Sequence, residues 1–555
     1  MRAIRFALPR QAGRGQFLIA PAINAYKVFY DQQITAGMAY CLTRKFRGNP
    51  FHHDERVAQS MQRSLRYMLA EGGLANPVIG GPMEHRNLRA SVTVVQLAGE
   101  LLPRGLRAAL VASHRACLAA LRERMRRYRD VRVFDARTLD TGTNHAWGYL
   151  AITALLARHL GEESVLSELA PFADRFAQAQ DRTGHWTENS GPTSVYTRVS
   201  AHYMGLVAEV FPTAALVRAA RRAADFQMRF SFPDGSSIEC FDERVQAHES
   251  FYDLSQYLFG LTTLRHHPQG PAYFSFLVDR LKQVCGSRTA FTSLELTHFI
   301  ADALLRIDSL RSATTWKPFD AQAHGDGFGT IRRGPWQVGW QALATRKWPG
   351  NCFFLDRQSL FSLWHDRCGR VVDGSNTKRQ PEIGTFSVIT DEGAFADPGA
   401  SLPTGGRWAK GAGLGSLVVA YPHFSARLDF LPRAGGALVL RARVRPRGRK
   451  MNRLLMNIRL PFRWGHRVRL ASGARMILGE HAPVELTAPQ GGPIDNGVVR
   501  FAASRPFAAT WPFIPFSSYR SPMHQREPAD AWFVASVDLD TARASTVELR
   551  WNAIR

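Results

Sequence analysis

The sequence predicts a multidomain chain of α then β type, in which an N-terminal incomplete (α/α) toroid precedes a C-terminal antiparallel β-sandwich. Three observations predict this fold class. Apolar residues recur with helical spacing over about the first 310 residues, two similar loops lie 51 positions apart within that part, and apolar and polar residues alternate from Trp316 onwards.

The helical part is recognised from apolar stripes. In the segment 53–73 the stripe is formed by Val57, Met61, Leu65 and Met68, whose spacing places them on one helical face. The segment 110–128 has a second such face, with its arginines on the solvent side. Further helices are expected at about 146–160, 164–180, 195–210, 213–229, 250–265, 271–284 and 292–310.

The two similar loops indicate a repeat. Residues 183–188 (TGHWTE) and 234–239 (DGSSIE) have a glycine at the same place, Gly184 and Gly235. A repeat of about 50 residues corresponds to one helical pair with its loops, and such pairs stack on a common core. Five to seven pairs would close into a toroid, whereas the alternative is an open, irregular helical domain.

The last part of the chain is predicted to be all β. Short alternating segments such as 329–348, 358–366, 415–432 and 436–446 follow one another with Gly and Pro between them and no intervening helix. The boundary is expected near 312–325. We therefore predict a helical domain over residues 1–315 that carries most of the active site, and a β-sandwich over residues 316–555.

The charge predicts an anionic partner. The chain has 71 Lys and Arg against 46 Asp and Glu, a net charge of +25 and an isoelectric point near 10.5. Only eight of the basic residues are lysine. GC-rich codons produce such a skew towards arginine without selection for binding. We therefore attribute the basic excess partly to background composition and partly to an anionic ligand. The sequence has no zinc-finger spacing, aromatic RNP pattern or basic heptad region, which argues against nucleic acid.

Our expectations for the cellular compartment and the cofactors rest on signals that the sequence lacks. We expect no secretory signal, no membrane span and no membrane partner. Six dispersed cysteines without a CxxC pair predict free thiols in the cytoplasm, or a periplasmic or secreted protein if an export signal was removed. No cofactor and no metal site are expected, although a structural divalent cation remains open, and the sequence does not predict the oligomeric state.

The first polar cluster lies at 140–149. Asn144 and His145 are expected at a junction from loop to helix, where side chains point into a mouth. The alternative is that Asn144 caps the helix and His145 is a partly buried residue of its first turn.

The second cluster lies at 184–196, followed by Arg198, His202 and Tyr203. It combines an aromatic plane (Trp186), a carboxylate (Glu188), an amide (Asn189) and the phenol of Tyr196. This mixture is typical of sugar binding, because a pyranose offers an apolar face and a rim of hydroxyls. The alternative is that the tryptophan and the tyrosines belong to the core.

A third cluster, at 233–244, supplies carboxylates beside Arg244, namely Asp234, Glu239, Asp242 and Glu243. If the hairpins stack, all three clusters fall on one rim of the toroid and line one cleft.

These clusters resemble the toroid-plus-β-sandwich polysaccharide lyases, which include heparinase II/III-type enzymes and several alginate lyases. In that group an Asn or His at the start of a toroid helix is followed some fifty-odd residues later by a catalytic Tyr. Here Tyr196 and Tyr203 follow His145 by 51 and 58 residues. The family's β-domain histidine has no counterpart in 350–356, which contains Asn351 but no histidine. His365 or His423 could replace it, or Asn351 could bind substrate.

The resemblance implies β-elimination on a uronic acid-containing anionic poly- or oligosaccharide. Asn144 would neutralise the substrate carboxylate, assisted by Arg198 or Arg244. His145 or Tyr196 would act as the base, and Tyr196 as the acid with Tyr203 in reserve. The substrate would be bound by Trp186, Glu188, Asn189, Arg198, His202, Glu239, Arg244, Asn351 and His365.

Two other functions stay open at this point. A toroidal glycoside hydrolase would need two carboxylates, which Glu188 with Asp234, Glu239 or Asp242 could supply. A non-catalytic binder of anionic glycans would need none of these polar loops for chemistry.

Overall fold

The computed structural model describes most of the chain. The residues described are 1–18, 32–71, 74, 84–127, 143–187, 191–242, 260–286, 301–302, 304–306, 309–310, 312–319, 322–344, 358–374, 380–391, 393–394, 398–447, 451–479, 484–488, 491–514 and 531–554.

The chain divides into two compact units. The helical unit comprises 1–188, 196–227 and 250–316, and the β unit comprises 189–195, 228–249 and 317–555. The last break between the two units lies between Trp316 and Lys317, and the first strand after it, β1, begins at Gln322. Two earlier segments of the expected helical domain, 189–195 and 228–249, group with the β unit instead.

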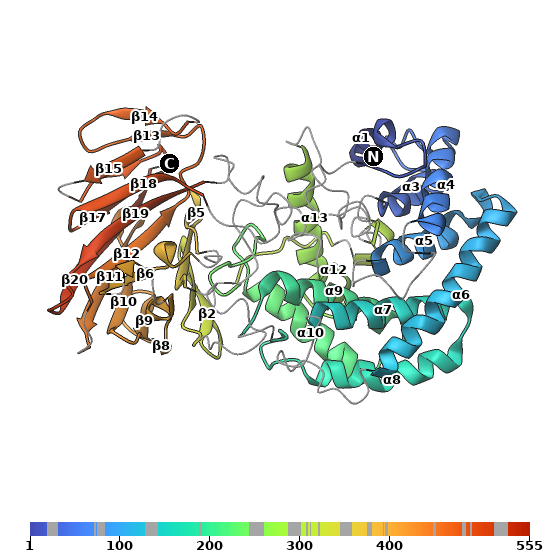
Figure 1. Cartoon of the computed structure of the whole chain (residues 1–555), viewed down its shortest axis with the longest axis horizontal. Coiled ribbons are helices and arrows are strands. Elements are labelled where there is room, and N and C mark those ends of the chain that lie inside the picture. The colour runs from blue at the N-terminus through green and yellow to red at the C-terminus, as the bar shows by residue number, and fades with distance from the viewer. Residues whose placement is uncertain are drawn as a thin grey trace. The chain divides into compact units, whose positions relative to one another are not determined.

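The helices of the helical unit, labelled in Figure 1, differ in how far they are buried. Its described helices are α1 (Arg2–Ala7), α3 (Ile34–Thr43), α4 (Glu55–Ala70), α5 (Glu84–Ala98), α6 (Arg104–Arg127), α7 (Thr143–Leu160), α8 (Glu163–Gln178), α9 (Ser194–Val210), α10 (Ala214–Arg229), α12 (Leu261–Leu264) and α13 (Gly270–Gly286). Helix α4 buries one stripe, which includes Val57, Met61, Leu65 and Met68, and leaves its other face exposed. By contrast, α7 is buried on nearly all sides.

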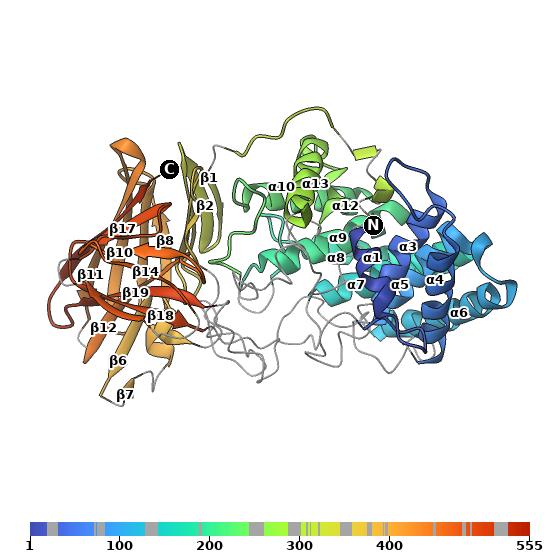
Figure 2. The ribbon, with the colours of Figure 1, turned by 90° about the horizontal axis from the view of Figure 1, so that it is seen from above.

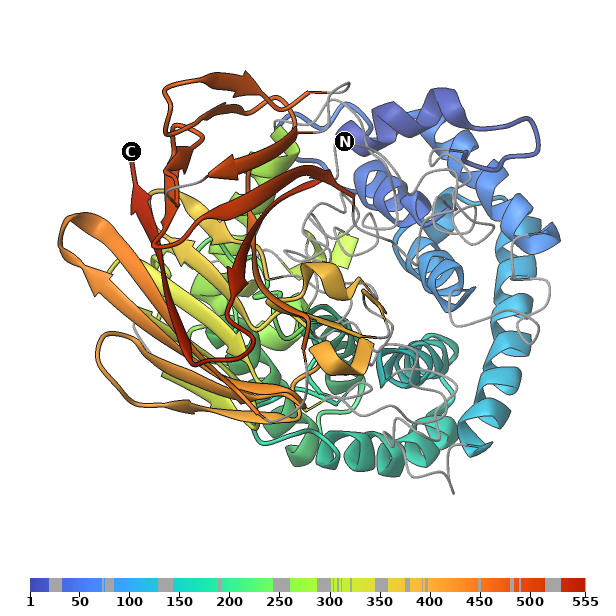
Figure 3. The same cartoon turned by 60° about the vertical axis from the view of Figure 1, so that its left-hand side comes forward.

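This difference separates an outer from an inner layer, because a helix that is apolar all round must be covered on every side. Figure 3 shows α6 on the outside of an arc of helices. Such a double layer of helices is what the repeat predicts for a toroid. No helix among the described residues combines the length and the apolar composition needed to cross a bilayer.

The β unit contains three antiparallel sheets, which Figure 2 shows from a second direction. Five strands form the sheet β1-β2-β3-β4-β5: Gln322–Gly325, Phe328–Arg333, Trp336–Gln341, Phe361–His365 and Gly369–Val372. Six form β15-β18-β19-β12-β6-β7: Val484–Ala488, Phe507–Phe513, Trp532–Leu539, Arg453–Leu460, Phe386–Thr390 and Gly393–Ala394.

The largest sheet has nine strands in the order β14-β13-β16-β17-β20-β11-β10-β9-β8. Their bounds are Arg475–Ile477, Arg467–Arg469, Ile494–Asp495, Val499–Ala503, Ser545–Ala553, Ala437–Pro446, Phe424–Arg433, Gly415–Ala420 and Gly405–Ala409. One apolar core joins all three sheets, with Leu363, Leu440 and Met456 as a buried member from each. The predicted α-then-β fold class is therefore confirmed, with a third, five-stranded sheet added to the sandwich.

A hairpin from within the helical sequence completes the β unit. Phe232 stacks on Trp364 of β4 with ring centroids 5.3 Å apart. Gln337 of β3 donates a hydrogen bond from Nε2 to the Ser231 carbonyl at 2.9 Å. Gly339 leaves room for this hairpin, because a Cβ there would lie 2.1 Å from Ile238. These contacts explain why 228–242 belongs with strands that follow it by a hundred residues.

Candidate active site

The helical unit places Asn144, His145 and Tyr196 in the first turns of two buried helices. Asn144 and His145 are the second and third residues of α7, and Tyr196 is the third residue of α9. Asn144 retains 6 % of its surface, whereas His145 and Tyr196 are half-buried. His145 and Tyr196 therefore lie at the edge of the core, whereas Asn144 is almost wholly buried at the start of α7.

The two helices are joined at their opposite ends. Arg158, in the last turn of α7, donates from Nη1 to the Glu209 carbonyl in the last turn of α9 at 3.0 Å. Asn144 precedes Arg158 by fourteen residues and Tyr196 precedes Glu209 by thirteen. At 1.5 Å of rise per residue, both lie about 20 Å back from this bond. Asn144 and Tyr196 therefore lie at the ends of α7 and α9 that are away from this bond.

Trp186 has the core role that the sequence left open. Its indole is 1 % exposed and packs edge-on against Trp147 of α7, with ring centroids 5.6 Å apart. Its Nε1–H donates to the Phe176 carbonyl at 3.1 Å. This corrects the expectation of an aromatic platform for sugar stacking, because neither face of the ring is open to a ligand.

Further along α9, the expected binding residues Arg198 and His202 and the reserve acid Tyr203 are also buried. The rings of His202 and Tyr203 meet edge-on, with centroids 6.0 Å apart. These three side chains lie in the interior of the protein, which corrects the expectation that they contact substrate. Tyr203 follows Tyr196 by seven residues, so it lies about 10 Å further along α9 from the start of the helix.

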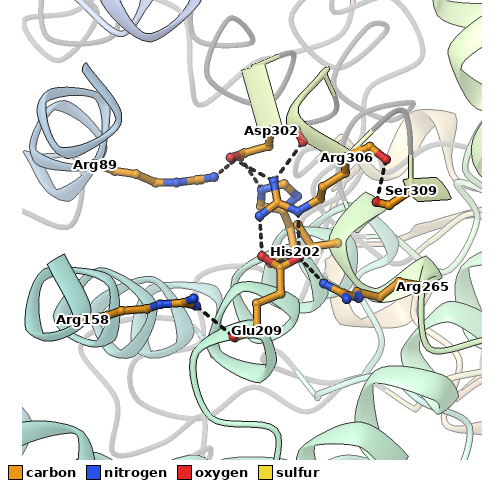
Figure 4. Close-up of polar contacts among 9 residues, drawn as sticks. Arg89, Arg158, His202, Glu209, Arg265, Asp302, Arg306 and Ser309 are labelled. Carbon is orange, nitrogen blue, oxygen red and sulfur yellow. Dashed lines mark hydrogen bonds and ion pairs between the residues drawn. The ribbon is translucent and has the colours of Figure 1, made fainter. Parts of the chain in front are cut away.

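His202 belongs to a buried network of charged groups (Figure 4). Burial and the nearby Arg89 and Arg306 hold the pKa of His202 well below its ordinary value. The ring is therefore neutral, and its Nε2–H donates to Asp302 Oδ2 at 3.0 Å. Arg89 of α5 forms an ion pair with the same carboxylate oxygen, and Arg306 Nη1 lies 3.5 Å from Asp302 Oδ1.

The network continues to Glu209 at the end of α9. Although burial raises the pKa of Glu209, the guanidinium groups of Arg306 and Arg265 lower it by more, and its net shift is downward. Arg306 Nε donates to Glu209 Oε1 at 2.7 Å, and Arg265 Nη1 does so at 3.3 Å. The carboxylates of Asp302 and Glu209 thus connect α5 and α9 with each other and with Arg306.

Sequence reasoning missed every member of this network except His202. Arg89, Glu209 and the pair Asp302 and Arg306 lie far apart in the chain, and none belongs to the three polar clusters. The one available signal is a charged residue on an otherwise apolar helix face, such as Arg89 between buried neighbours in α5. A buried charge is rarely stable unless it is paired.

The β unit buries two of the carboxylates considered for a glycoside hydrolase, Glu239 and Asp242. Glu239 is fully buried, and this burial raises its pKa to about 8 against the opposing effect of Arg370, with which it forms an ion pair. Asp242 accepts a hydrogen bond from the Val195 amide at 2.8 Å, and Asp234 from the Ser236 amide at 2.9 Å. The expectation that Glu239 binds substrate is therefore corrected: it holds the hairpin onto β5.

His365 lies at the end of β4 and is also buried. Its Nδ1 accepts a hydrogen bond from the Arg367 amide at 3.2 Å, and its ring meets Trp336 with centroids 4.6 Å apart. Burial lowers its pKa. It is thus a hydrogen-bonded sheet residue, which corrects its assignment as a binding residue, and His423 is likewise buried.

The remaining expected site residues, Glu188, Asn189, Arg244 and Asn351, lie outside the described residues, as does Glu243. Within the described ranges, no group of three or more His, Cys, Asp or Glu side chains is arranged to hold a metal ion.

Comparison with known proteins gives a likeness in fold. No family model matches the chain, and no curated protein is similar to it in sequence. The chain superposes on a Streptomyces coelicolor A3 chondroitin AC lyase, in complex with chondroitin sulphate, with a TM-score of 0.55 and 13 % identity over 100 % of this chain and 78 % of that one. It superposes on a mutant of the heparan sulfate lyase HepC from Pedobacter heparinus with a TM-score of 0.50 and 12 % identity, over 99 % and 82 %.

The predicted resemblance to the toroid-plus-β-sandwich polysaccharide lyases is therefore confirmed for the fold. Both neighbours match over the whole length of this chain, so the likeness includes the helical part and the sheets together.

Proposed function

We propose that this protein is a polysaccharide lyase that cleaves a uronic acid-containing anionic poly- or oligosaccharide by β-elimination. The observation that carries the proposal is a likeness over the whole chain to two lyases, in a protein whose two inner helices begin with an Asn-His pair and a Tyr. Fold alone does not specify activity, and it is the residues at the helix starts that favour a lyase.

The first requirement of the reaction is neutralisation of the uronate carboxylate. The C5 proton is too weakly acidic to leave beside an ionised carboxylate, so donors must stabilise the enolate that develops. The Asn144 amide can donate two hydrogen bonds to it. The amides in the first turn of α7 add partial positive charge at the same place.

The second requirement is a base and an acid on the sugar ring. A base, His145 or Tyr196, removes the C5 proton, and its electron pair forms the C4–C5 double bond. The C4–O4 bond then breaks, and Tyr196 gives a proton to the departing O4. Positioned groups of this kind typically contribute about 10²–10⁴-fold each.

Two observations weigh against the hydrolase alternative. Glu239 and Asp242 are each 1 % exposed, and each has a structural partner in the hairpin or the sheet. A hydrolase needs two accessible carboxylates on opposite sides of the scissile bond.

The deciding experiment is a product assay on a panel of uronate polymers: polygalacturonate, alginate, hyaluronan, chondroitin sulfate and heparan sulfate. A lyase creates a C4–C5 double bond conjugated with the carboxylate, which absorbs in the near ultraviolet. We expect absorbance and new reducing ends to rise together on at least one polymer. New reducing ends without absorbance would replace the proposal by a hydrolase, and neither signal on any polymer would contradict catalysis on this class.

A further inference from the structure

The outer face of the nine-stranded sheet carries a group of arginines, which we call the arginine face. It comprises six arginines and two carboxylates from four strands: Arg407, Arg427, Arg441, Arg443, Arg445, Arg550, Asp429 and Glu548. It carries a charge of +4 and belongs to the β unit, whereas Asn144, His145 and Tyr196 belong to the helical unit.

The register of the strands places these residues on one side. Arg407 of β8 lies opposite Val418 of β9, Val418 opposite Arg427 of β10, and Arg427 opposite Arg443 of β11. Residues directly opposite in an antiparallel pair point to the same side of the sheet. Strands lie about 4.8 Å apart, so this row spans four strands in about 15 Å.

Neighbouring rows on the same side extend the face. Two residues further along each strand, Asp429 lies opposite Arg441, and Arg441 opposite Glu548. Arg445 lies two residues beyond Arg443, and Arg550 two beyond Glu548. The residues between them in β11, Ala442 and Val444, are buried in the core, so the alternation fixes which side is exposed.

The two carboxylates of the arginine face form ion pairs with some of its arginines but leave it with a net positive charge. Asp429 accepts from Arg427 Nε at 2.8 Å and lies 3.5 Å from Arg443 Nη1, and Glu548 accepts from Arg441 Nε at 2.7 Å. For Arg407 and Arg445, both exposed, the described part of the chain provides no ion pair. Arginine offers a planar fork of donors that matches carboxylates and sulfates.

The chemistry of the face favours a glycan over a nucleic acid. Single-stranded nucleic acids are held by aromatic side chains on which the bases stack, beside a basic groove. The arginine face has no aromatic member, and Trp408, next to Arg407 in β8, packs against the core. A flat array of guanidinium groups instead suits a chain whose sugars each carry a carboxylate or a sulfate.

We propose that the arginine face is a second binding surface for an anionic polysaccharide, which holds the polymer while the active site acts on another part of it. The choice of polysaccharide rests on the proposed function, whereas the surface itself rests on the register and the charges. Cleavage of long chains would gain from this contact, and cleavage of short oligosaccharides would not.

The test compares two double variants of equal charge change. R407Q/R445Q removes two exposed arginines of the face for which the described residues provide no ion pair. R66Q/R115Q removes two exposed arginines from α4 and α6 in the helical unit and serves as the control. Migration is followed in native gels that contain chondroitin sulfate, heparan sulfate, alginate or polygalacturonate, at several salt concentrations.

We expect the polymers to retard the wild type and the control equally, and R407Q/R445Q several-fold less. We also expect its salt dependence to be reduced by about one to two in the slope of log affinity against log salt. The proposed surface would be contradicted if the polymers retarded both double variants equally. It would also be contradicted if no polymer retarded the wild type. The proposal would also be overturned if single-stranded DNA retarded the wild type as much as the polysaccharides do and this retardation were lost in R407Q/R445Q. That result would assign the arginine face to nucleic acid.

This binding test is independent of turnover. If the gels give the expected order but no polymer yields a near-ultraviolet product, the proposed lyase fails and the surface stands. If a product forms, R407Q/R445Q should raise KM for the polymer and leave kcat/KM for a tetrasaccharide unchanged. An unchanged KM for the polymer would contradict the surface and leave the lyase intact.

Discussion

At the scale of single residues, position within a helix separates the candidate catalytic groups from structural ones. Tyr196 and Tyr203 belong to the same helix and both suit the sequence spacing expected after His145. Tyr196 lies in the first turn and is half-buried, whereas Tyr203 is 2 % exposed and packs against His202. The structure thus favours one of two tyrosines between which spacing alone could not decide.

The variant Tyr196→Phe tests the role of this phenol. It removes the proton donor and keeps the ring, so we expect kcat to fall about 10²–10⁴-fold with the thermal unfolding midpoint nearly unchanged. Initial rates of near-ultraviolet product formation measure the loss. The matched control Tyr203→Phe should keep kcat within a few-fold, and a similar fall in both variants would mean that Tyr196 acts only through packing.

His114 of α6 predicts a pH dependence of stability. Burial is the main cause that lowers the pKa of His114 to about 3 from an ordinary 6.5, and the neighbouring His159 lowers it further. The His114 Nε2 lies 2.9 Å from Ser91 Oγ. Between pH 6.5 and 3 the unfolded chain therefore binds one proton more than the native protein. The free energy of unfolding should fall by up to about 1.4 kcal/mol per pH unit as the pH falls through this range.

Urea unfolding followed by helical circular dichroism, at pH values from 7 to 5, measures this slope. The variant His114→Gln has no titratable group there and should show a shallower slope than the wild type. Parallel slopes for the two proteins would rule out His114 as the source.

At the scale of elements, α9 is the helix on which the candidate site and the buried network meet. Its first turn carries Tyr196, its middle His202 and its end Glu209. His202 and Glu209 connect it to α5 through Asp302 and Arg89, and to α7 through Arg158. The network therefore fixes the position of the helix that presents Tyr196.

The variant Asp302→Asn should be strongly destabilising. It leaves Arg89, whose side chain is 5 % exposed, without the charge of its carboxylate partner. Loss of one partner from a buried ion pair costs about 3–5 kcal/mol. The control Glu168→Gln breaks the exposed pair with Arg122 between α8 and α6, and screening by solvent makes that loss small.

Thermal unfolding of both variants measures the difference. In assays of the activity that remains, we expect Asp302→Asn to lower kcat by a larger factor than it raises KM. The reason is that a displaced Tyr196 would stabilise the transition state less, while substrate binding would change little. Equal midpoints for the two variants would contradict a supporting role for the network.

The two similar loops show how far the sequence predicts the elements. Gly184 and Gly235 both adopt positive φ, 97° and 84°, in turns closed by equivalent backbone bonds. This local likeness is what the sequence detects. It cannot detect that Phe232 stacks on Trp364 and carries the second loop into the β unit, because that depends on residues more than a hundred positions away. Charged residues that pair across similar separations, such as Arg89 and Asp302, escape for the same reason.

At the scale of the whole molecule, the fold class is predictable because it depends on periodicity, which is local. The way the +25 net charge is distributed over the protein cannot be predicted in this way, because it depends on which faces of helices and strands are exposed. Part of the charge is used inside the protein, where Arg89, Arg306, Arg370 and Arg459 are wholly or largely buried. The arginines on the outer sheet face are a second, exposed population.

The net charge predicts that recognition of a polyanion weakens with salt. Exposed charges are screened within about 10 Å at 0.1 M ionic strength, whereas the buried groups of the network are screened much less. If the protein cleaves a polymer as proposed, we expect KM for that polymer to rise several-fold between about 0.05 and 0.2 M salt. We expect kcat to stay nearly constant, because the chemistry proposed for Asn144 and Tyr196 does not depend on distant charges. Initial rates at graded NaCl measure both constants, with a tetrasaccharide as the control for contacts at the active site alone. A fall in kcat with constant KM would mean that salt acts on the catalytic step, and a constant KM with constant kcat would mean that the arginines contribute nothing to binding.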